Sequence, residues 1–194
     1  SLKPIKVTVE EEEEEEEEVV VTPKPRTWYN LYGVTFGDNN TFVAVGNSGI
    51  VRYSSSDNRS SWDNGTSGAT SHLLEIVYGN QTFVAVGYSG TILNSSDNGS
   101  TWSSATWSGS DHLTGVAYGN NIFNAVSSAN VIKSTDNGSN WTLKSSAVEV
   151  YDMGFGNRTA SSTAFIGVGA DGSVCYSKDS TPHFHGEEWS CVLP

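Results

Sequence analysis

The sequence predicts an all-β fold, a small β-propeller of about four four-stranded blades preceded by an N-terminal β-arm. A recurring segment ends at Gly46, Gly87, Ser127 and Gly169, so its copies are spaced by 41, 40 and 42 residues. Each period contains short runs of alternating apolar and polar residues, separated by Asn-Gly or Asn-Asn pairs that favour hairpin turns. Four strands in each of four repeats is typical of propeller blades, and amphipathic helices of about ten to twelve residues have no room here.

The chain begins with a segment that is unlike the repeats. Residues 5–9 alternate like a strand, residues 10–18 are all glutamate, and residues 19–22 resume β character before a Pro-Lys-Pro linker. We therefore divide the chain into an extended arm with a poly-Glu tract, residues 1–26, and a four-repeat propeller, residues 27–194. The β-prone runs of the arm have no partner within the four repeats, so we expect the arm to add a strand to a neighbouring subunit.

In the third repeat, for example, the predicted strands cover residues 113–118, 122–127, 131–134 and 141–144. The same spacing of alternating runs and turn residues recurs in the first two repeats, and more weakly in the fourth.

The charge balance argues against several classes of partner. The net charge is −12, but nine of the 22 acidic residues form the glutamate run. The other 13 acidic residues (22 − 9) face 10 basic ones, which leaves −3 for the rest of the chain. Few arginines and no basic cluster argue against nucleic acid and against an anionic membrane surface. No apolar run approaches the roughly 18–20 residues that a membrane-spanning helix needs.

A second motif follows each copy of the first, with an aspartate five residues before a tryptophan in the first three repeats. In the fourth repeat an insertion separates the two residues. The motif residues are Asp57 and Trp62, then Asp97, Gly99 and Trp102, then Asp136, Gly138 and Trp141, and finally Asp179 and Trp189. The first copy has Arg59 where the second and third copies have glycine.

The Ser-x-Asp-x-Gly-x-x-Trp pattern resembles the Asp-box, or BNR repeat, of sialidase-like and photosystem-assembly-factor-like β-propellers. The resemblance covers roughly residues 30–192 and implies that each box is the turn between the third and fourth strands of a blade. In such a turn the carboxylate accepts backbone N–H bonds, the glycine takes a left-handed conformation and the tryptophan packs between blades. We therefore expect these residues to be structural.

The sequence does not favour an enzyme, and we expect neither catalytic residues nor a cofactor. The sialidase resemblance implies six blades and an arginine triad for an active enzyme, whereas four repeats give four blades. The arginines do not occupy equivalent repeat positions; they are Arg26, Arg52, Arg59 and Arg158. The sequence also lacks the zinc-protease, serine-hydrolase and phosphate-loop motifs.

Two pairs of histidines have different interpretations. His72 and His112 lie 40 residues apart at equivalent repeat positions, which indicates a structural role. His183 and His185 would share a face of an extended segment, beside two glutamates, and could hold a metal ion there. An exposed polar loop is the simpler alternative, so we treat this pair as weak candidates and predict no metal site.

The only two cysteines, Cys175 and Cys191, fall on the predicted third and fourth strands of the last repeat. They can face each other across a hairpin, and a disulfide there would contribute about 3 kcal/mol by closing the loop. Two reduced cysteines are the alternative. The placement favours the disulfide, and with it an oxidising, extracellular or cell-surface location.

Glycosylation sequons are more numerous than chance predicts. Nine asparagines begin Asn-x-Ser/Thr without proline at x: Asn39, Asn58, Asn64, Asn80, Asn94, Asn98, Asn137, Asn140 and Asn157. The repeat composition is the alternative explanation, since the Asn-Gly-Ser of the second motif itself generates sequons. We favour a heavily N-glycosylated secreted surface.

Together these features predict a non-catalytic, secreted and glycosylated structural subunit. We expect it to form a homo-oligomer or polymer through its N-terminal strand, because a head-to-tail contact that does not close produces a filament. The alternative is a lectin or adhesin, in which exposed Trp28, Tyr29, Tyr88 or Trp107 would stack on sugars. Trp107 has no counterpart at the repeat spacing, which weakens this alternative.

Overall fold

The computed structural model describes residues 28–38, 40–54, 61–146, 149–159, 162–177 and 189–192. These residues form four antiparallel sheets of four strands each, and within every sheet the strands follow one another in chain order. The prediction of an all-β propeller with four four-stranded blades is confirmed. The predicted arm lies outside the described residues, so it stays a prediction.

Each blade is formed by one sequence repeat, and we number the blades along the chain. Blade 1 contains β1 (Leu31–Phe36), β2 (Phe42–Gly46), β3 (Val51–Ser54) and β4 (Trp62–Asn64). Blade 2 contains β5 (Leu73–Gly79), β6 (Thr82–Gly87), β7 (Ile92–Ser95) and β8 (Ser103–Ser104). Blade 3 contains β9 (Gly115–Gly119), β10 (Ile122–Val126), β11 (Asn130–Ser134) and β12 (Thr142–Ser146). Blade 4 contains β13 (Val150–Thr159), β14 (Ser162–Gly169), β15 (Val174–Ser177) and β16 (Trp189–Val192).

The turns within the blades use the residue types that the sequence indicates. Between β9 and β10, Asn120 and Asn121 have φ values of +50° and +60°, as a two-residue hairpin turn requires. The sequence does not predict the connections from the second to the third strand in detail. In three blades they are short 3-10 turns, η1 (Asn47–Gly49), η2 (Tyr88–Gly90) and η3 (Ala170–Gly172). No helix within the described residues is long and apolar enough to cross a membrane.

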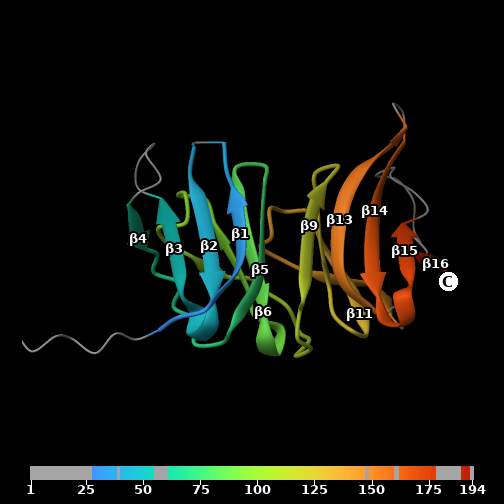
Figure 1. Ribbon diagram of the computed structural model, residues 1–194, viewed down its shortest axis with the longest axis horizontal. Helices are drawn as coiled ribbons and strands as arrows, with labels where there is room; N and C mark the ends of the chain where they lie inside the picture. Colours follow the sequence, from blue (N-terminus) through green and yellow to red (C-terminus); the bar gives the residue numbers. More distant parts are fainter. Residues whose placement is uncertain are drawn as a thin grey trace, which may run out of the picture.

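The blades follow one another along an arc. The first strand of each blade is the innermost, and contacts run in series from β1 to β5, from β5 to β9 and from β9 to β13. Blade 1 and blade 4 lie at opposite ends of the long axis of the molecule (Figure 1). Within the described residues, β13 makes no comparable packing contact with β1. Among the described residues, the first and last blades therefore each have a neighbour on one face only.

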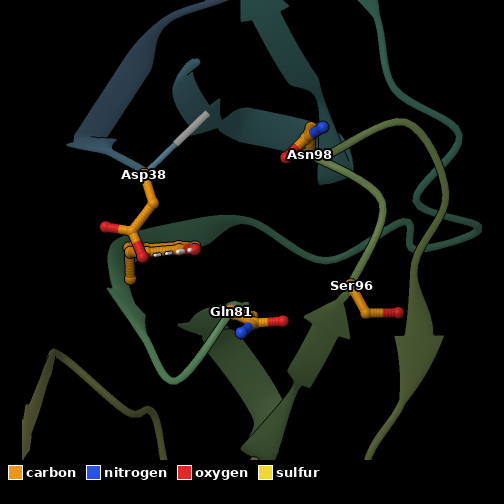
Figure 2. A pocket seen from close by; sticks show the side chains of 5 residues that line it. Asp38, Gln81, Ser96 and Asn98 are labelled. Carbon is orange, nitrogen blue, oxygen red and sulfur yellow. Dashed lines mark hydrogen bonds between the residues drawn. The ribbon is translucent and has the colours of Figure 1, made fainter. Parts of the chain in front are cut away.

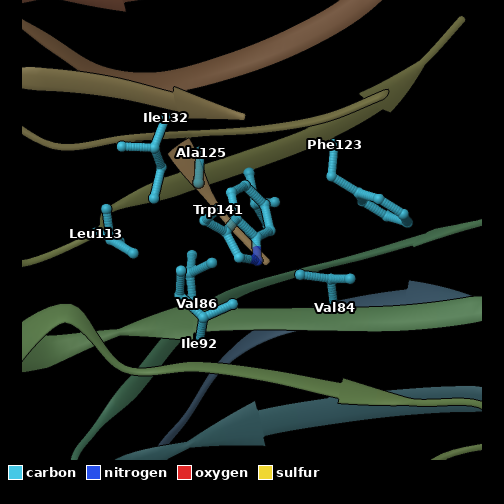
Figure 3. Packing of buried hydrophobic residues seen from close by; sticks show 9 residues of the cluster. Val84, Val86, Ile92, Leu113, Phe123, Ala125, Ile132 and Trp141 are labelled. Atoms are coloured by element: carbon cyan, nitrogen blue, oxygen red, sulfur yellow. The ribbon is translucent and has the colours of Figure 1, made fainter. Parts of the chain in front are cut away.

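The hydrophobic core is divided among the junctions between successive blades. Val43 of blade 1 packs with Ile76 of blade 2 in the first junction, and Val131 packs with Met153 in the third. At the second junction Trp141 of blade 3 inserts beside Val84 of blade 2 (Figure 3). Since both faces of an inner blade are covered in this way, its strands are apolar on both sides.

Candidate functional site

The turn between β7 and β8 is organised around the carboxylate of Asp97. Its Oδ1 accepts hydrogen bonds from the Thr101 backbone N–H at 2.9 Å and from the Ser95 hydroxyl at 2.8 Å, and its Oδ2 accepts from the Thr101 hydroxyl at 2.5 Å. The backbone N–H of Gly99 donates to Ser95 Oγ at 3.1 Å. Burial opposes ionisation of Asp97, but the hydrogen bonds from Thr101 and Ser95 outweigh it and hold its pKa below the ordinary value.

The turn between β11 and β12 repeats this geometry one blade later. Asp136 Oδ1 accepts from the Asn140 backbone N–H at 2.9 Å and from the Ser134 hydroxyl at 2.7 Å, while Oδ2 accepts from the Asn140 side-chain amide at 2.7 Å. These hydrogen bonds, those from Asn140 foremost, lower the pKa of Asp136. Because the donors come from its own turn, the carboxylate holds the backbone rather than reaching toward a ligand.

Each of these turns also joins its blade to the one before. Gly99 and Gly138 have φ values of +83° and +78°, in the left-handed region. The indole N–H of Trp102 donates to the Gly99 carbonyl at 2.9 Å, and that of Trp141 donates to Gly138 at 2.9 Å. Trp102 packs against the core between blades 1 and 2, and Trp141 lies in the core between blades 2 and 3.

The first and last copies of the motif are described only in part. Asp57, Arg59 and Asp179 lie outside the described residues, so their roles stay predictions. Trp62 is exposed, unlike Trp141, which is buried. Trp189 is half-buried, and its indole N–H is buried without a hydrogen-bond partner among the described residues.

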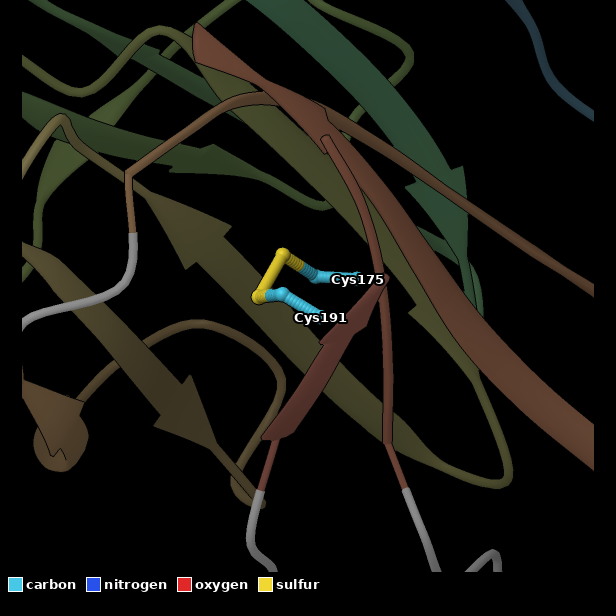
Figure 4. Close-up of a disulfide and its surroundings, with 2 residues drawn as sticks. All are labelled: Cys175 and Cys191. Carbon is cyan, nitrogen blue, oxygen red and sulfur yellow. A yellow bond between two sulfur atoms is a disulfide. The ribbon is translucent and has the colours of Figure 1, made fainter. Parts of the chain in front are cut away.

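The two cysteines are opposite each other at the outer edge of blade 4. Cys175 on β15 pairs directly with Cys191 on β16, and their sulfur atoms are 2.05 Å apart, a disulfide (Figure 4). Cys175 is buried. The bond therefore fastens β16 to the rest of the sheet.

The sequon asparagines differ in what their side-chain nitrogens do. The Nδ2 of Asn94 donates to the Gly138 carbonyl at 3.2 Å, that of Asn80 donates to Asn137 at 2.6 Å, and that of Asn140 belongs to the Asp136 turn. Asn64 instead uses its oxygen, which accepts from the Arg52 guanidinium. A glycan is attached through Nδ2, so Asn64 is better suited to carry one. Asn39 and Asn58 lie outside the described residues, as does the side chain of Asn157, and Asn98 sits in the Asp97 turn.

The repeat-equivalent histidines link neighbouring blades. His72 Nδ1 accepts the backbone N–H of Ser48 from blade 1 at 2.9 Å, and His112 Nδ1 accepts that of Ser89 from blade 2 at 3.0 Å. Within the described ranges, no three His, Cys, Asp or Glu side chains gather as metal ligands. The weak metal candidates His183 and His185 lie outside those ranges, so a metal site there stays a hypothesis from the sequence.

A polar hollow of about 310 Å³ opens between blades 1 and 2, where sequence reasoning predicted no site. It is lined by Asp38, Tyr78, Gln81, Ser96 and Asn98, four of which are labelled in Figure 2. The Tyr78 hydroxyl donates to Asp38 Oδ2 at 3.3 Å. Burial, together with the nearby Asp38 carboxylate, raises the pKa of Tyr78. Tyr78 lies on β5 and the other lining residues lie in turns, with Asp38 in blade 1 and the rest in blade 2, which is why no local motif marks them.

Of the four aromatic residues proposed as sugar platforms, Trp28, Tyr29 and Tyr88 are exposed. Tyr88 stacks on His112 with ring centroids 4.4 Å apart, so one of its faces is already covered. The prediction for Trp107 is wrong: this residue packs against the core between blades 2 and 3, and its indole nitrogen is buried. A tryptophan outside the repeat pattern here fills an inter-blade gap, which a comparison of the repeats does not indicate.

No protein-family model matches the sequence, and no curated protein matches it either. Solved structures do match, at low identity. The chain is similar to YCF48 from Cyanidioschyzon merolae, with 16% identity and a TM-score of 0.62 over 89% of this chain and 58% of that one. A structure described as YCF48 bound to D1 peptide gives 17% identity and a TM-score of 0.59, over 88% of this chain and 57% of that one. The chain thus spans less than two thirds of the length of YCF48.

Two further solved structures show how general the likeness is. An ancestral GH74 enzyme matches with 14% identity and a TM-score of 0.62, over 85% of this chain but 27% of its own. The computationally designed Ika4 protein matches with 14% identity and a TM-score of 0.60, over 78% of this chain and 92% of its own. Because YCF48, a GH74 enzyme and a designed protein share this architecture at 14–17% identity, the likeness shows the fold alone.

Proposed function

We propose that this chain is a non-catalytic structural subunit that assembles with copies of itself. The observation that carries this proposal is the exposure of large apolar side chains on the two terminal blades. Val34 on blade 1 is 61% exposed and Val168 on blade 4 is 50% exposed. Large apolar side chains exposed on a folded protein are typical of interaction surfaces when they lie together on one face.

The use of the carboxylates supports a non-catalytic role. Asp97 and Asp136 are engaged by donors of their own turns, and we propose that these turns, with those around Asp57 and Asp179, are Asp-box repeats with a purely structural task. The Asp38 carboxylate in the polar hollow is bonded to a tyrosine hydroxyl. A typical glycoside hydrolase would instead need a pair of carboxyl groups facing open space.

Secretion and N-glycosylation belong to the same proposal. The disulfide between Cys175 and Cys191 suits an oxidising compartment. Asn64 lies exposed on β4 and keeps its amide nitrogen outside the turn networks. Intact-mass measurement before and after glycosidase treatment of native protein tests this, and peptide mapping should find a glycan at Asn64 ahead of Asn140. Unmodified peptides at all sequons would overturn this part of the proposal.

Light scattering of the full chain over a hundredfold range of concentration tests self-assembly. We expect the mean mass to rise in multiples of the chain mass, and negative-stain images to show whether the product is a ring or a filament. A chain that stays monomeric throughout would contradict the proposed function. A truncated chain beginning at Pro23 tests the arm separately: if the β-prone runs within residues 1–22 add the joining strand, that truncated chain will remain monomeric.

A second candidate function is ligand binding. The ligand would be a glycan, as for a lectin, or a peptide, by analogy with the D1 peptide bound to YCF48. Exposed Trp28, Tyr29 and Tyr88 and the polar hollow between blades 1 and 2 favour it. The exposed aromatic rings suit the apolar face of a ligand, and the hydroxyl and amide groups of the hollow suit a polar ligand, so these are two separate candidate sites. A glycan array, followed by titration of Trp28→Ala and Tyr88→Ala, tests this: binding that these variants do not weaken would dismiss the aromatic residues as the site.

A further inference from the structure

We propose that the outer face of blade 4 docks onto the outer face of blade 1 of a second copy, reproducing between chains the junction that occurs three times within the chain. This inference rests on the proposed self-assembly and replaces the arm as its main contact.

The internal junctions define the two complementary faces. At the first junction, Val43, Val45 and Val51 of blade 1 pack against Leu73 and Ile76 of blade 2, and all five are buried. At the second, the matching residues of blades 2 and 3 are again buried; they are Val84, Val86 and Ile92 against Leu113 and Val116. At the third, Val126 and Val131 pack against Val150 and Met153. We call the face that meets the next blade the leading face, and the face that meets the previous blade the trailing face.

The leading face of blade 4 has the same pattern but nothing covers it among the described residues. Ile166, Val168 and Val174 occupy the positions of Val43, Val45 and Val51 in the repeat alignment. They are 36%, 50% and 44% exposed, whereas their counterparts in blade 1 are at most 1% exposed. A shallow hollow of about 310 Å³ borders Ile166 and Val168 and is more apolar than the hollow between blades 1 and 2.

The trailing face of blade 1 is uncovered in the same way. Leu31 and Val34 occupy the positions of Leu73 and Ile76 and are 49% and 61% exposed, against 0% and 3%. Trp62 stands where Trp102 packs on the preceding blade, and it too is exposed. Arg52 stands where Leu93 is buried and donates to Asn64, so this part of the face is polar. The apolar part lies on β1 and β4.

A second copy of the chain is the occupant that fits both faces. The exposed apolar residues of the two faces are equivalent in the repeat alignment to apolar residues that are buried in the internal junctions. One face corresponds to the leading side of such a junction and the other to the trailing side. A contact between them is heterologous, so two copies joined at both faces close a ring, whereas copies joined at one face continue as a filament. An unrelated partner has no such built-in complementarity to either face.

Charged substitutions on each face test the proposal. In the full chain, Val168→Asp and Val34→Asp each place a carboxylate in an exposed position, so the fold tolerates them while the junction does not. Each variant alone should remain monomeric by light scattering at a concentration where the wild type assembles. Leu143→Asp, at an exposed apolar position of inner blade 3, is the matched control and should assemble like the wild type.

Mixing the two variants gives a more specific outcome. Chains with Val34→Asp keep an intact leading face and chains with Val168→Asp keep an intact trailing face, so together they should form a one-to-one dimer that grows no further. If the wild type assembles and both variants assemble equally well, the blade faces are not the contact and the proposal is overturned, while self-assembly stands. If the wild type is monomeric at every concentration, the proposed function fails and this inference fails with it.

Discussion

Gly99 of blade 2 lies so close to Val43 of blade 1 that a Cβ atom on the glycine would come within 2.8 Å of Val43 Cγ2. The same relationship recurs one blade later, where a Cβ on Gly138 would come within 2.7 Å of Val84 Cγ2. Glycine is therefore required in each turn for two reasons. Its backbone is left-handed, and a Cβ atom would clash with the valine of the preceding blade.

Gly99→Ala should destabilise the protein by about 2–4 kcal/mol, since backbone strain and overpacking add. Gly68→Ala is the matched control: Gly68 also has a positive φ, +67°, but a Cβ there meets nothing within 4 Å. The control should cost about 1 kcal/mol, from backbone strain alone. Urea unfolding of both variants measures the difference, and equal losses would show that contact with Val43 is unimportant.

Asp97→Ala and Asp136→Ala should each lower the free energy of unfolding by about 1–3 kcal/mol, because backbone donors in the turn lose their acceptor. Asp63→Ala, on exposed strand β4, serves as the control and should change stability by less than about 0.5 kcal/mol. Thermal unfolding gives the comparison. Loss of a binding activity at unchanged stability would instead mark these carboxylates as functional.

Acid should weaken the two turns. Folding lowers the pKa values of Asp97 and Asp136 below their ordinary value of 3.8. The stability that the two ionised carboxylates provide is therefore complete above pH 3.8 and is lost as the pH falls through their folded-state pKa values. Glu75, whose pKa is raised by burial, acts in the opposite direction near its ordinary value of 4.5. The double variant Asp97→Asn and Asp136→Asn should therefore lose less stability than the wild type between pH 5 and about pH 2.5. Parallel losses would exclude these two carboxylates as the acid-sensitive groups.

Reduction of the disulfide should destabilise blade 4. Cys175 and Cys191 are 16 residues apart, so opening the loop costs about 3 kcal/mol and lowers the melting temperature by several degrees. Calorimetry with and without reductant measures this, with the double variant Cys175→Ala and Cys191→Ala as a chain that reductant cannot affect. Free thiols at both positions in native protein would contradict the pairing.

Asn124→Val should stabilise the junction between blades 3 and 4 by about 1 kcal/mol. Asn124 is fully buried, and its Nδ2 has no hydrogen-bond partner among the described residues. Val43 and Val84 hold the equivalent positions in blades 1 and 2. The reverse change, Val84→Asn, should destabilise, and if both substitutions destabilise, Asn124 has a role that valine does not fill.

The repeats made the blades predictable because each strand and turn depends on neighbours within about forty residues. The left-handed turn at Gly99 and the hydrogen bonds to Asp97 follow from residues four apart or fewer, and the structure has them as the motif implies. The pairing of Cys175 with Cys191 needs only the hairpin between β15 and β16.

Features that combine different blades could not be predicted in this way. Trp107 has no repeat counterpart, so its insertion against the core between blades 2 and 3 leaves no periodic signal. Asp38 and Ser96 meet at one hollow although 58 residues separate them. The exposure of Val34 and Val168 is also invisible in sequence, since their side chains match those buried in the inner blades.

The serial arrangement of the blades has a consequence for cooperativity. Because the extensive packing contacts among the described residues lie within a blade or between blades that are neighbours in sequence, the unfolding free energy is approximately a sum of terms for single blades and for the junctions between them. Blades 2 and 3 have two junctions each, whereas blades 1 and 4 have one, so the ends of a lone chain open first and the middle pair keeps its amide protons longest. If a second chain joined end to end, the terminal blades would gain a second junction and their amide protons would exchange as slowly as those of the middle blades. Slower amide exchange in blades 1 and 4 would then indicate the contact between chains.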